Sequence, residues 1–300
     1  MAACLPKPGV VMQLERVLAY LAKVTHLDES AFSPLYFVGE RLGCVNAVWR
    51  ERLLQQESAL FQPWRDGLAC LAGGDYAHLS RTLQAAAERW RDAGWLNGWR
   101  NENFRAERSD GSPCFELERA AFRPLGLTSH AVHLNGLTRA VDGSPHMWLG
   151  RRSPYKAVDP NRMDNMVGGG VAAGESIEVA REREGWEEAG LSAGLLADLS
   201  PVSRLLAERP VQRGLHREWL HVFDVWLPPG SAPVNQDGEV AEHVCLPFSE
   251  VEALLVDERF MIDAALVAAD CLARHGYWGE QGGRVRAALT GRDTPEFQQR

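Results

Sequence analysis

The sequence predicts an α/β fold preceded by a smaller α+β unit. Two observations favour this: helical and strand patterns alternate from about residue 127 onward, and shorter helices and strands are mixed before that point. The chain has 300 residues, 45% of them hydrophobic, which is enough for two packed cores. We therefore expect an N-terminal α+β domain over 1–125, an α/β domain over 126–280 and a polar C-terminal extension over 281–300.

The elements of the N-terminal domain follow from apolar periodicity and turn residues. Apolar residues at helical spacing between Leu14 and Leu21 predict a helix over 12–24. Gly39, which lies between two apolar runs, predicts a hairpin over 35–45. Further predicted elements are helices over 48–56 and 76–95 and two strands within 104–122, around a turn at 109–112.

The second domain begins with two predicted strands separated by turn residues, and a glycine-rich loop and a helix follow. Interleaving of this kind is typical of a sheet covered by helices. The predicted strands are 129–138, 146–153, 215–227 and 242–248, and the late helices are 249–257 and 262–276.

Charge and composition disfavour several classes of function. Lys and Arg number 32 against 40 Asp and Glu, a net charge of -8, which is unlike the electrostatic footprint of a nucleic-acid binder. No apolar run approaches the roughly 20 residues of a membrane span. The six cysteines are scattered without a CxxC pair, and the N-terminus lacks a signal-peptide apolar run, so we expect a cytoplasmic protein with reduced thiols.

Residues 169–191 carry the strongest chemical signal. Glycines at 168, 169, 170 and 174 predict a loop whose backbone can approach a ligand closely. Ser176 is a suitable N-cap for the helix that follows, and Gly190 is a suitable stop.

Three glutamates of that helix fall on one face. Glu184, Glu187 and Glu188 lie within an arc of about 100°, and neighbouring carboxylates at ~5–6 Å repel by roughly 3 kcal/mol at an effective dielectric of ~20. A solvated acidic face would tolerate this repulsion, whereas a divalent cation such as Mg²⁺ or Mn²⁺ would exploit it. Arg183 points to another side, where it can anchor Glu175 and brace the loop.

The segment resembles the Nudix box, G-x5-E-x7-R-E-U-x-E-E-x-G-U, in which U is aliphatic. The motif residues in register are Gly169, Glu175, Arg183, Glu184, Glu187, Glu188, Gly190 and Leu191. Gly185 is the one departure, since it stands at an aliphatic position, and we expect close packing there. The resemblance implies a Nudix α/β/α sandwich with a mixed sheet, and a hydrolase that cleaves a diphosphate joined to another group.

The resemblance also implies the site residues. Glu187 and Glu188 are the expected metal ligands, with the Gly169 carbonyl, and Glu184 is a further ligand or the general base. Arg183 joins Glu184 and Glu187 in the expected catalytic set. A further glutamate on a later loop is common in the family, and both Glu239 and Glu242 fit this role.

A narrower resemblance covers most of the chain. It is to a Nudix subfamily with an extra N-terminal domain, similar to the Nudix part of fungal thiamine pyrophosphokinase fusions and to plant plastid proteins. The segments that carry it are 99–107, 115–137, 148–153, 162–176 and 265–277. It implies hydrolysis of thiamine diphosphate, or of its damaged oxo and oxy forms, to the monophosphate and phosphate.

Several residues are candidate substrate contacts, each with a structural alternative. Arg151 and Arg152 can pair with a diphosphate or form a surface pair. Trp99 can stack on a heteroaromatic ring or be buried, and His133 and Asn135, on one side of a strand, can bind a ligand or satisfy the core.

Other functions stay open at this point. They are hydrolysis of nucleoside diphosphates linked to another group, ligand sensing without cleavage, and isoprenoid diphosphate isomerisation, for which no fitting acid/base set is apparent. The N-terminal domain either closes over the substrate or mediates self-association as a homodimer.

Overall fold

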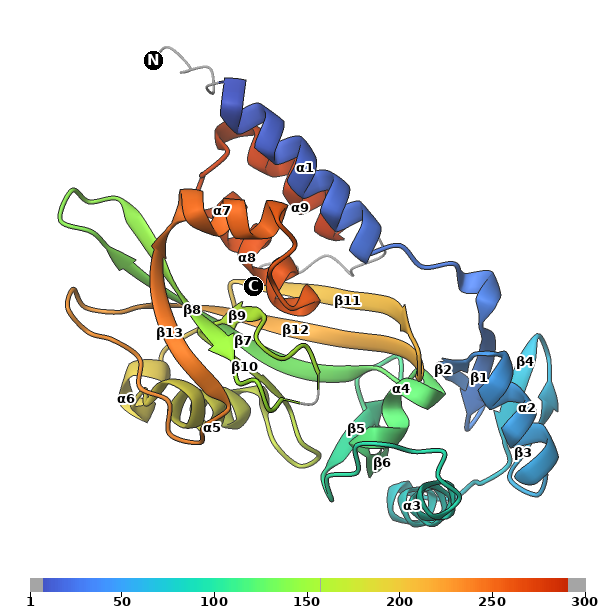
Figure 1. Cartoon of the computed structure of the whole chain (residues 1–300). Coiled ribbons are helices and arrows are strands. Elements are labelled where there is room, and N and C mark those ends of the chain that lie inside the picture. The colour runs from blue at the N-terminus through green and yellow to red at the C-terminus, as the bar shows by residue number, and fades with distance from the viewer. Residues whose placement is uncertain (1–7, 157, 291–300) are drawn as a thin grey trace.

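The computed structural model describes residues 8–156 and 158–290, which form two units with separate hydrophobic cores (Figure 1). The larger unit is built on a seven-stranded sheet in the order β11-β12-β7-β8-β13, to which β10 adds beside β7 and β9 beside β8. Its strands are β7 (Ser129–Arg139), β8 (Pro145–Arg152), β9 (Met163–Asn165), β10 (Val167–Gly170), β11 (Ser203–Val211), β12 (Gly214–Trp226) and β13 (Val240–Pro247).

Helices cover both faces of this sheet. Strands β7 and β12 run parallel and the other pairs are antiparallel, so the sheet is mixed. Helices α5 (Ile177–Ala189) and α6 (Ala193–Leu196) lie on one face, and α7 (Phe248–Val256) and α8 (Ile262–Arg274) lie on the other (Figure 1). This arrangement confirms the predicted α/β/α sandwich.

The smaller unit packs helices against two small sheets. One sheet has the order β2-β1-β4-β3, and the other is the β5–β6 hairpin. The elements are β1 (Ser33–Phe37), β2 (Glu40–Val45), α2 (Ala47–Gln56), β3 (Phe61–Trp64), β4 (Gly67–Cys70), α3 (Tyr76–Asp92), β5 (Asn103–Glu107), β6 (Pro113–Glu118) and α4 (Phe122–Leu125), with 3-10 turns at Glu29–Ala31 and Arg119–Ala121.

The structure differs from the predicted domain assignment at both ends of the chain. Helix α1 (Pro8–Val24), counted with the N-terminal unit, packs on the C-terminal helices, and its Leu21 is fully buried in the core of the larger unit. Residues 281–300 were expected to be a polar extension, yet α9 (Gly282–Thr290), which follows a 3-10 turn at Gly279–Gln281, buries Val285 and Leu289 in that core. Residues 291–300 lie outside the described residues.

Some strands were missed and one loop was misassigned. The four-residue strands β3 and β4 carry too few residues for a clear alternation, and β9 and β11 were not recognised. Three of the glycines expected to form a loop lie in a strand instead. They belong to β10 (Val167–Gly170), which pairs antiparallel with β7, and the loop follows this strand. The backbone hydrogen bonds of this strand come from its neighbour in the sheet, and a run of glycines gives no indication of them in the sequence.

The two units meet closely at α4. A Cβ added at Gly43 would lie 2.3 Å from the Leu125 carbonyl oxygen, and one added at Gly214 would lie 2.1 Å from the Arg123 carbonyl oxygen. Glycine at these positions lets β2 and β12 approach the same short helix. The junction is therefore packed backbone to backbone.

No helix among the described residues is both long enough and apolar enough to span a bilayer.

The position of α1 makes a testable prediction. Leu21→Ala should lower the free energy of unfolding of the larger unit by about 2–5 kcal/mol, because it leaves a cavity between α1 and the C-terminal helices. Hydrogen exchange should then rise in α7 and α9 and not in α2. Met12→Ala, at an exposed position of the same helix, is the matched control and should change stability by less than about 0.5 kcal/mol. Equal effects of the two changes would contradict the assignment of α1.

Candidate metal and diphosphate site

The glycine loop and α5 form the centre of the site, and local signals define both ends of the helix. The Ser176 side chain accepts a hydrogen bond from the Val179 N–H, and Gly190 ends the helix with a left-handed backbone at φ 65°. Gly185 packs closely as expected, since an added Cβ would lie 2.6 Å from Leu196 Cδ1. These contacts fix the rotation of α5 and so the direction of its glutamates.

Arg183 holds the loop to the helix. Its Nε and Nη2 donate to the two Glu175 oxygens at 2.8 and 2.9 Å, and Nη2 also donates to the Gly170 carbonyl at 3.1 Å. Its Nη1 donates to Glu184 at 2.6 Å and to Glu187 at 3.3 Å. The hydrogen bonds to Arg183 lower the pKa of Glu175, so this carboxylate stays ionised. The bracing role expected of Arg183 is confirmed.

Glu184 lies directly on the backbone of the loop. A Cβ added at Gly169 would be only 1.9 Å from the Glu184 carboxyl carbon, so any other residue at 169 would displace the carboxylate. Burial raises the pKa of Glu184, and the neighbouring Arg183 opposes this shift. Glycine at this motif position is thus required by the contact with Glu184.

Glu188 is a buried carboxylate in an acidic environment. It is 6% exposed, and one oxygen accepts a hydrogen bond from the Gly168 N–H at 2.8 Å. Burial is the main cause that raises the pKa of Glu188, and the charges of Asp164 and Glu184 add to it. Glu187 is half-buried on the same helix face. Glu184 and Glu188 therefore both lie against the backbone of β10, and Glu187 shares Arg183 with Glu184.

Lys156 supplies a cation that the sequence analysis did not single out. Its ammonium pairs with Glu239, and its charge acts on Glu184 and Glu188. Burial lowers the pKa of Lys156. Its signal in the sequence is its rarity, since the chain has lysine only at positions 7, 23 and 156. Asp164, on β9, is a second residue of the site that the sequence did not identify as a candidate ligand.

The structure separates the two candidate loop glutamates. Glu242 pairs with Arg151 at 2.8 Å. Both lie on the α7–α8 face of the sheet, because Arg151 is two residues from Leu149 and Glu242 is two residues from Val244, and both of these pack in the core on that face. Glu239 instead pairs with Lys156, and the loop before it contacts α5, since the Gln236 N–H donates to the Glu187 carbonyl at 2.8 Å. Arg151 and Glu242 are therefore not brought to the site.

Arg152 lies near the site and is bonded within the protein. Nη1 donates to Asp164 at 2.6 Å, and Nε and Nη2 donate to the Val158 carbonyl at 3.2 and 2.9 Å. These bonds use three of the five N–H donors of the guanidinium and fix its position. Arg152 therefore braces the loop after β8, whereas it was expected to contact a diphosphate.

His133 and Asn135 belong to a buried polar chain. They are 2% and 0% exposed, and the ring of His133 hydrogen-bonds Asn165 at 2.9 Å, while Asn135 donates to Asp224 at 3.0 Å. Asp224 also accepts from Arg274 of α8 at 2.7 Å. His133 and Asn135 therefore satisfy the hydrogen bonds of the core and do not bind a ligand, because neither side chain is exposed.

Trp99 is held within the smaller unit. Its indole N–H donates to Asn101 at 2.8 Å, and the Arg91 guanidinium lies 4.6 Å from the ring centre. The structure does not bring this residue to the glutamates of α5.

Two other clusters of potential metal ligands are neutralised by arginine. Asp224, beside Cys271 and His275, accepts from Arg274. Asp263, beside His216 and Glu218, is bonded by Arg209. A bound cation would compete with a fixed positive charge in each. On α5, Arg183 bonds Glu184 and Glu187, but the buried Glu188 accepts from the neutral Gly168 N–H, which leaves it the better cation ligand.

Comparison with known proteins agrees with this geometry. The NUDIX domain family model matches residues 135–266, which include the loop and all three glutamates. A Nudix hydrolase of Streptomyces coelicolor is 35% identical over 141 residues, which cover 47% of this chain and 74% of that protein.

Two plant relatives match more of the chain. Nudix hydrolase 24, chloroplastic, of Arabidopsis thaliana is 35% identical over 186 residues, 61% of this chain and 50% of that protein. Nudix hydrolase 20, chloroplastic, of the same organism is 32% identical over 214 residues, 67% of this chain and 57% of that protein. The chain thus spans about half the length of these relatives.

The relatives correct the prediction of a cytoplasmic location. Both Arabidopsis proteins are named as chloroplastic. The prediction was wrong because it relied on the missing apolar run at the N-terminus, whereas transit peptides are amphipathic and lack such a run.

The motif in register, the sandwich and the matches together identify the chain as a member of the Nudix family.

Proposed function

We propose that this hydrolase uses Mg²⁺ or Mn²⁺ to cleave thiamine diphosphate, or its oxo and oxy analogues, to the monophosphate and phosphate. The observation that carries the metal-dependent activity is the position of Glu184 and Glu188 against the backbone of β10, with Glu187 bonded to the same Arg183 as Glu184. The substrate class rests on the resemblance described above, which extends over both units.

The residues of the site fit a divalent cation. Glu188 is buried beside Asp164 and Glu184, and its hydrogen-bond donor is the neutral Gly168 N–H. Such an arrangement leaves negative charge uncompensated in a low-dielectric environment, which is costly unless a cation binds. Carboxylate and carbonyl oxygens are also the donors that Mg²⁺ and Mn²⁺ prefer. Glu184, Glu187, Glu188 and the Gly169 carbonyl would hold the ion, and Glu239 is the proposed further ligand.

The side chains of the site have separable roles in the reaction. A bound divalent ion would lower the pKa of a water molecule and neutralise charge on the phosphates. In the proposed reaction Glu184 accepts a proton at a carboxylate oxygen, and the 2.6 Å hydrogen bond from Arg183, which orients this carboxylate, supports the role. Lys156 can leave the partly exposed Glu239 and donate to a phosphate oxygen.

The loop after β8 offers an aromatic surface for the ring of the substrate. Tyr155, next to Lys156, is 94% exposed, unlike the buried aromatic residues of both cores. A cationic heteroaromatic ring such as thiazolium is attracted to the face of an aromatic side chain. The acidic surroundings of the site also favour a substrate whose organic part is positive.

Metal binding should stabilise the protein more at high pH. Glu188 has a raised pKa, so the metal-free protein loses stability as pH rises above about 4.5, the ordinary value, and Mg²⁺ binds the ionised form. Mg²⁺ at roughly 100 times Kd should add about 2.7 kcal/mol. The rise in melting temperature should be larger at about pH 8 than at about pH 6. Glu188→Gln should remove it and the exposed control Glu280→Gln should keep it; an equal rise in both variants would place the ion elsewhere.

Substrate assays test the proposed activity directly. The protein with Mg²⁺ should release phosphate from oxythiamine diphosphate, and Glu184→Gln should lower kcat by roughly 10²–10⁴-fold, because a proton acceptor is lost. Glu187→Gln controls for contaminating phosphatases. A panel with nucleoside diphosphates linked to other groups, under the same conditions, decides the substrate class. Faster turnover of such compounds would overturn the thiamine assignment and leave the hydrolase intact.

Lys156→Met should lower kcat/KM by roughly 10–100-fold, since it removes a charge-assisted hydrogen bond worth about 1.5–3 kcal/mol. Lys23→Met, which removes a lysine paired with Glu258 far along the chain, should leave kcat/KM unchanged. Steady-state kinetics and Mg²⁺ binding are to be measured together. If Lys156→Met turned over normally, the lysine would have no role in substrate binding.

A further inference from the structure

The hairpin of the smaller unit touches the glycine loop through its backbone. The Ala173 N–H donates to the Asn103 carbonyl of β5 at 2.7 Å. On the opposite side the Val171 N–H donates to the His130 carbonyl of β7 at 2.9 Å. The loop that follows β10 is thus held between a strand of the larger unit and a strand of the smaller one.

A side chain of the same hairpin packs on β10. A Cβ added at Gly170 would lie 2.8 Å from Cζ of Phe104, so the tip of the ring faces the glycine. Phe104 is 6% exposed and meets Phe122 edge to face, with ring centres 5.4 Å apart, and the Arg119 guanidinium lies 4.9 Å from its ring centre. The ring therefore has little freedom to move away from Gly170.

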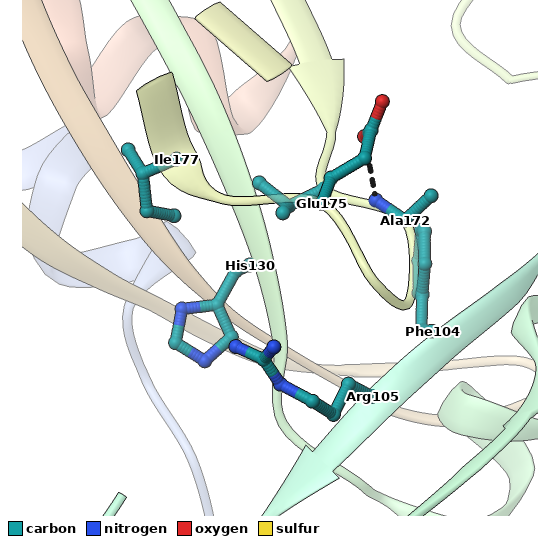
Figure 2. Close-up of a pocket in the computed structure, with 7 residues that line it drawn as sticks. Phe104, Arg105, His130, Ala172, Glu175 and Ile177 are labelled. Carbon is teal, nitrogen blue, oxygen red and sulfur yellow. Dashed lines mark hydrogen bonds between the residues drawn. The ribbon is translucent and has the colours of Figure 1, made fainter. Parts of the chain in front are cut away.

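Little empty space remains between these elements. Figure 2 shows the pocket where the hairpin, β7 and the loop meet, lined by Phe104, Arg105, His130, Val171, Ala172, Glu175 and Ile177. Its volume is about 30 Å³, room for about two water molecules. A shift of the hairpin would be transmitted to the loop beside this pocket, through the Ala173–Asn103 hydrogen bond and the contact of Phe104 with Gly170.

We infer that the β5–β6 hairpin is a positioning element of the metal site, with Asn103 and Phe104 as its positioning residues. Gly170 adjoins Gly169, whose carbonyl is a proposed metal ligand, and its own carbonyl is bonded by Arg183. Mg²⁺ and Mn²⁺ sites tolerate little displacement of their ligands, because Mg²⁺ requires near-octahedral geometry at about 2.1 Å. The smaller unit thereby completes the site of the larger one. The inference rests on the proposed metal site and not on the identity of the substrate.

Two changes at Phe104 disturb the contact in opposite ways. Phe104→Leu withdraws the ring from Gly170, whereas Phe104→Tyr keeps the ring and adds an oxygen at Cζ, which pushes against the loop. Phe61→Leu and Phe61→Tyr are the matched controls, since Phe61 is fully buried in the same core and lies on β3, away from the loop. If Phe104→Leu fails to fold, the tyrosine pair still tests the inference.

Mn²⁺ binding and hydrogen exchange are the readouts, alongside thermal unfolding. We expect each Phe104 variant to bind Mn²⁺ about 10-fold more weakly than its Phe61 counterpart of similar stability, a difference of about 1.4 kcal/mol. Exchange of the amides of residues 171–173 should rise in the metal-free Phe104 variants alone. Equal Mn²⁺ affinity and equal exchange in the two series would overturn the inference. Failure of the wild-type protein to bind Mn²⁺ would instead overturn the proposed metal site, and the exchange data would still decide whether the hairpin holds the loop.

Discussion

The site depends on the hydrogen bonds that the guanidinium of Arg183 makes. One planar group bonds Glu175, Glu184 and the Gly170 carbonyl, and so ties the loop, the helix and the end of β10 together. Arginine can do this because its donors diverge in a fixed plane. The hydrogen bonds to Arg183 also lower the pKa of Glu175 and keep this carboxylate ionised and oriented, while burial raises the pKa values of the nearby Glu184 and Glu188. Without this group, the repulsion between neighbouring glutamates would act on an unanchored loop.

The acidic cluster supports the proposed binding of a divalent cation. Glu184 and Glu188 have raised pKa values because they are buried, and Asp164 adds negative charge next to Glu188. Arg152, at the end of β8, and Lys156, in the loop after it, offset part of this charge. The remaining negative charge is a cost to folding that a bound divalent ion would convert into binding energy. A protein that only needed stability would have little reason to bury these carboxylates.

The two units are more closely connected than their order in the chain suggests. Helix α1 begins the chain but packs in the core of the larger unit, and the smaller unit follows it (Figure 1). The β5–β6 hairpin then returns to the glycine loop, and α4 is wedged between β2 and β12. Both connections are made by backbone groups and glycines, so the backbones of the two units approach closely, with no side chain between them at these points. The smaller unit is therefore anchored to the larger one on the side of the site.

The sequence by itself determined the longer helices of residues 12–276, most strands and the loop–helix motif, because apolar periodicity, caps and motif spacing are local, and the resemblance of that motif implied the sandwich. Tertiary structure decided the rest. Only sheet pairing shows that Glu242 lies on the far face and that Glu239 lies near Lys156. Only packing shows that His133 is buried and that Arg152 is already bonded to Asp164. A side chain's role as ligand or brace depends on which partners the fold brings to it, and residues distant in the chain supply those partners.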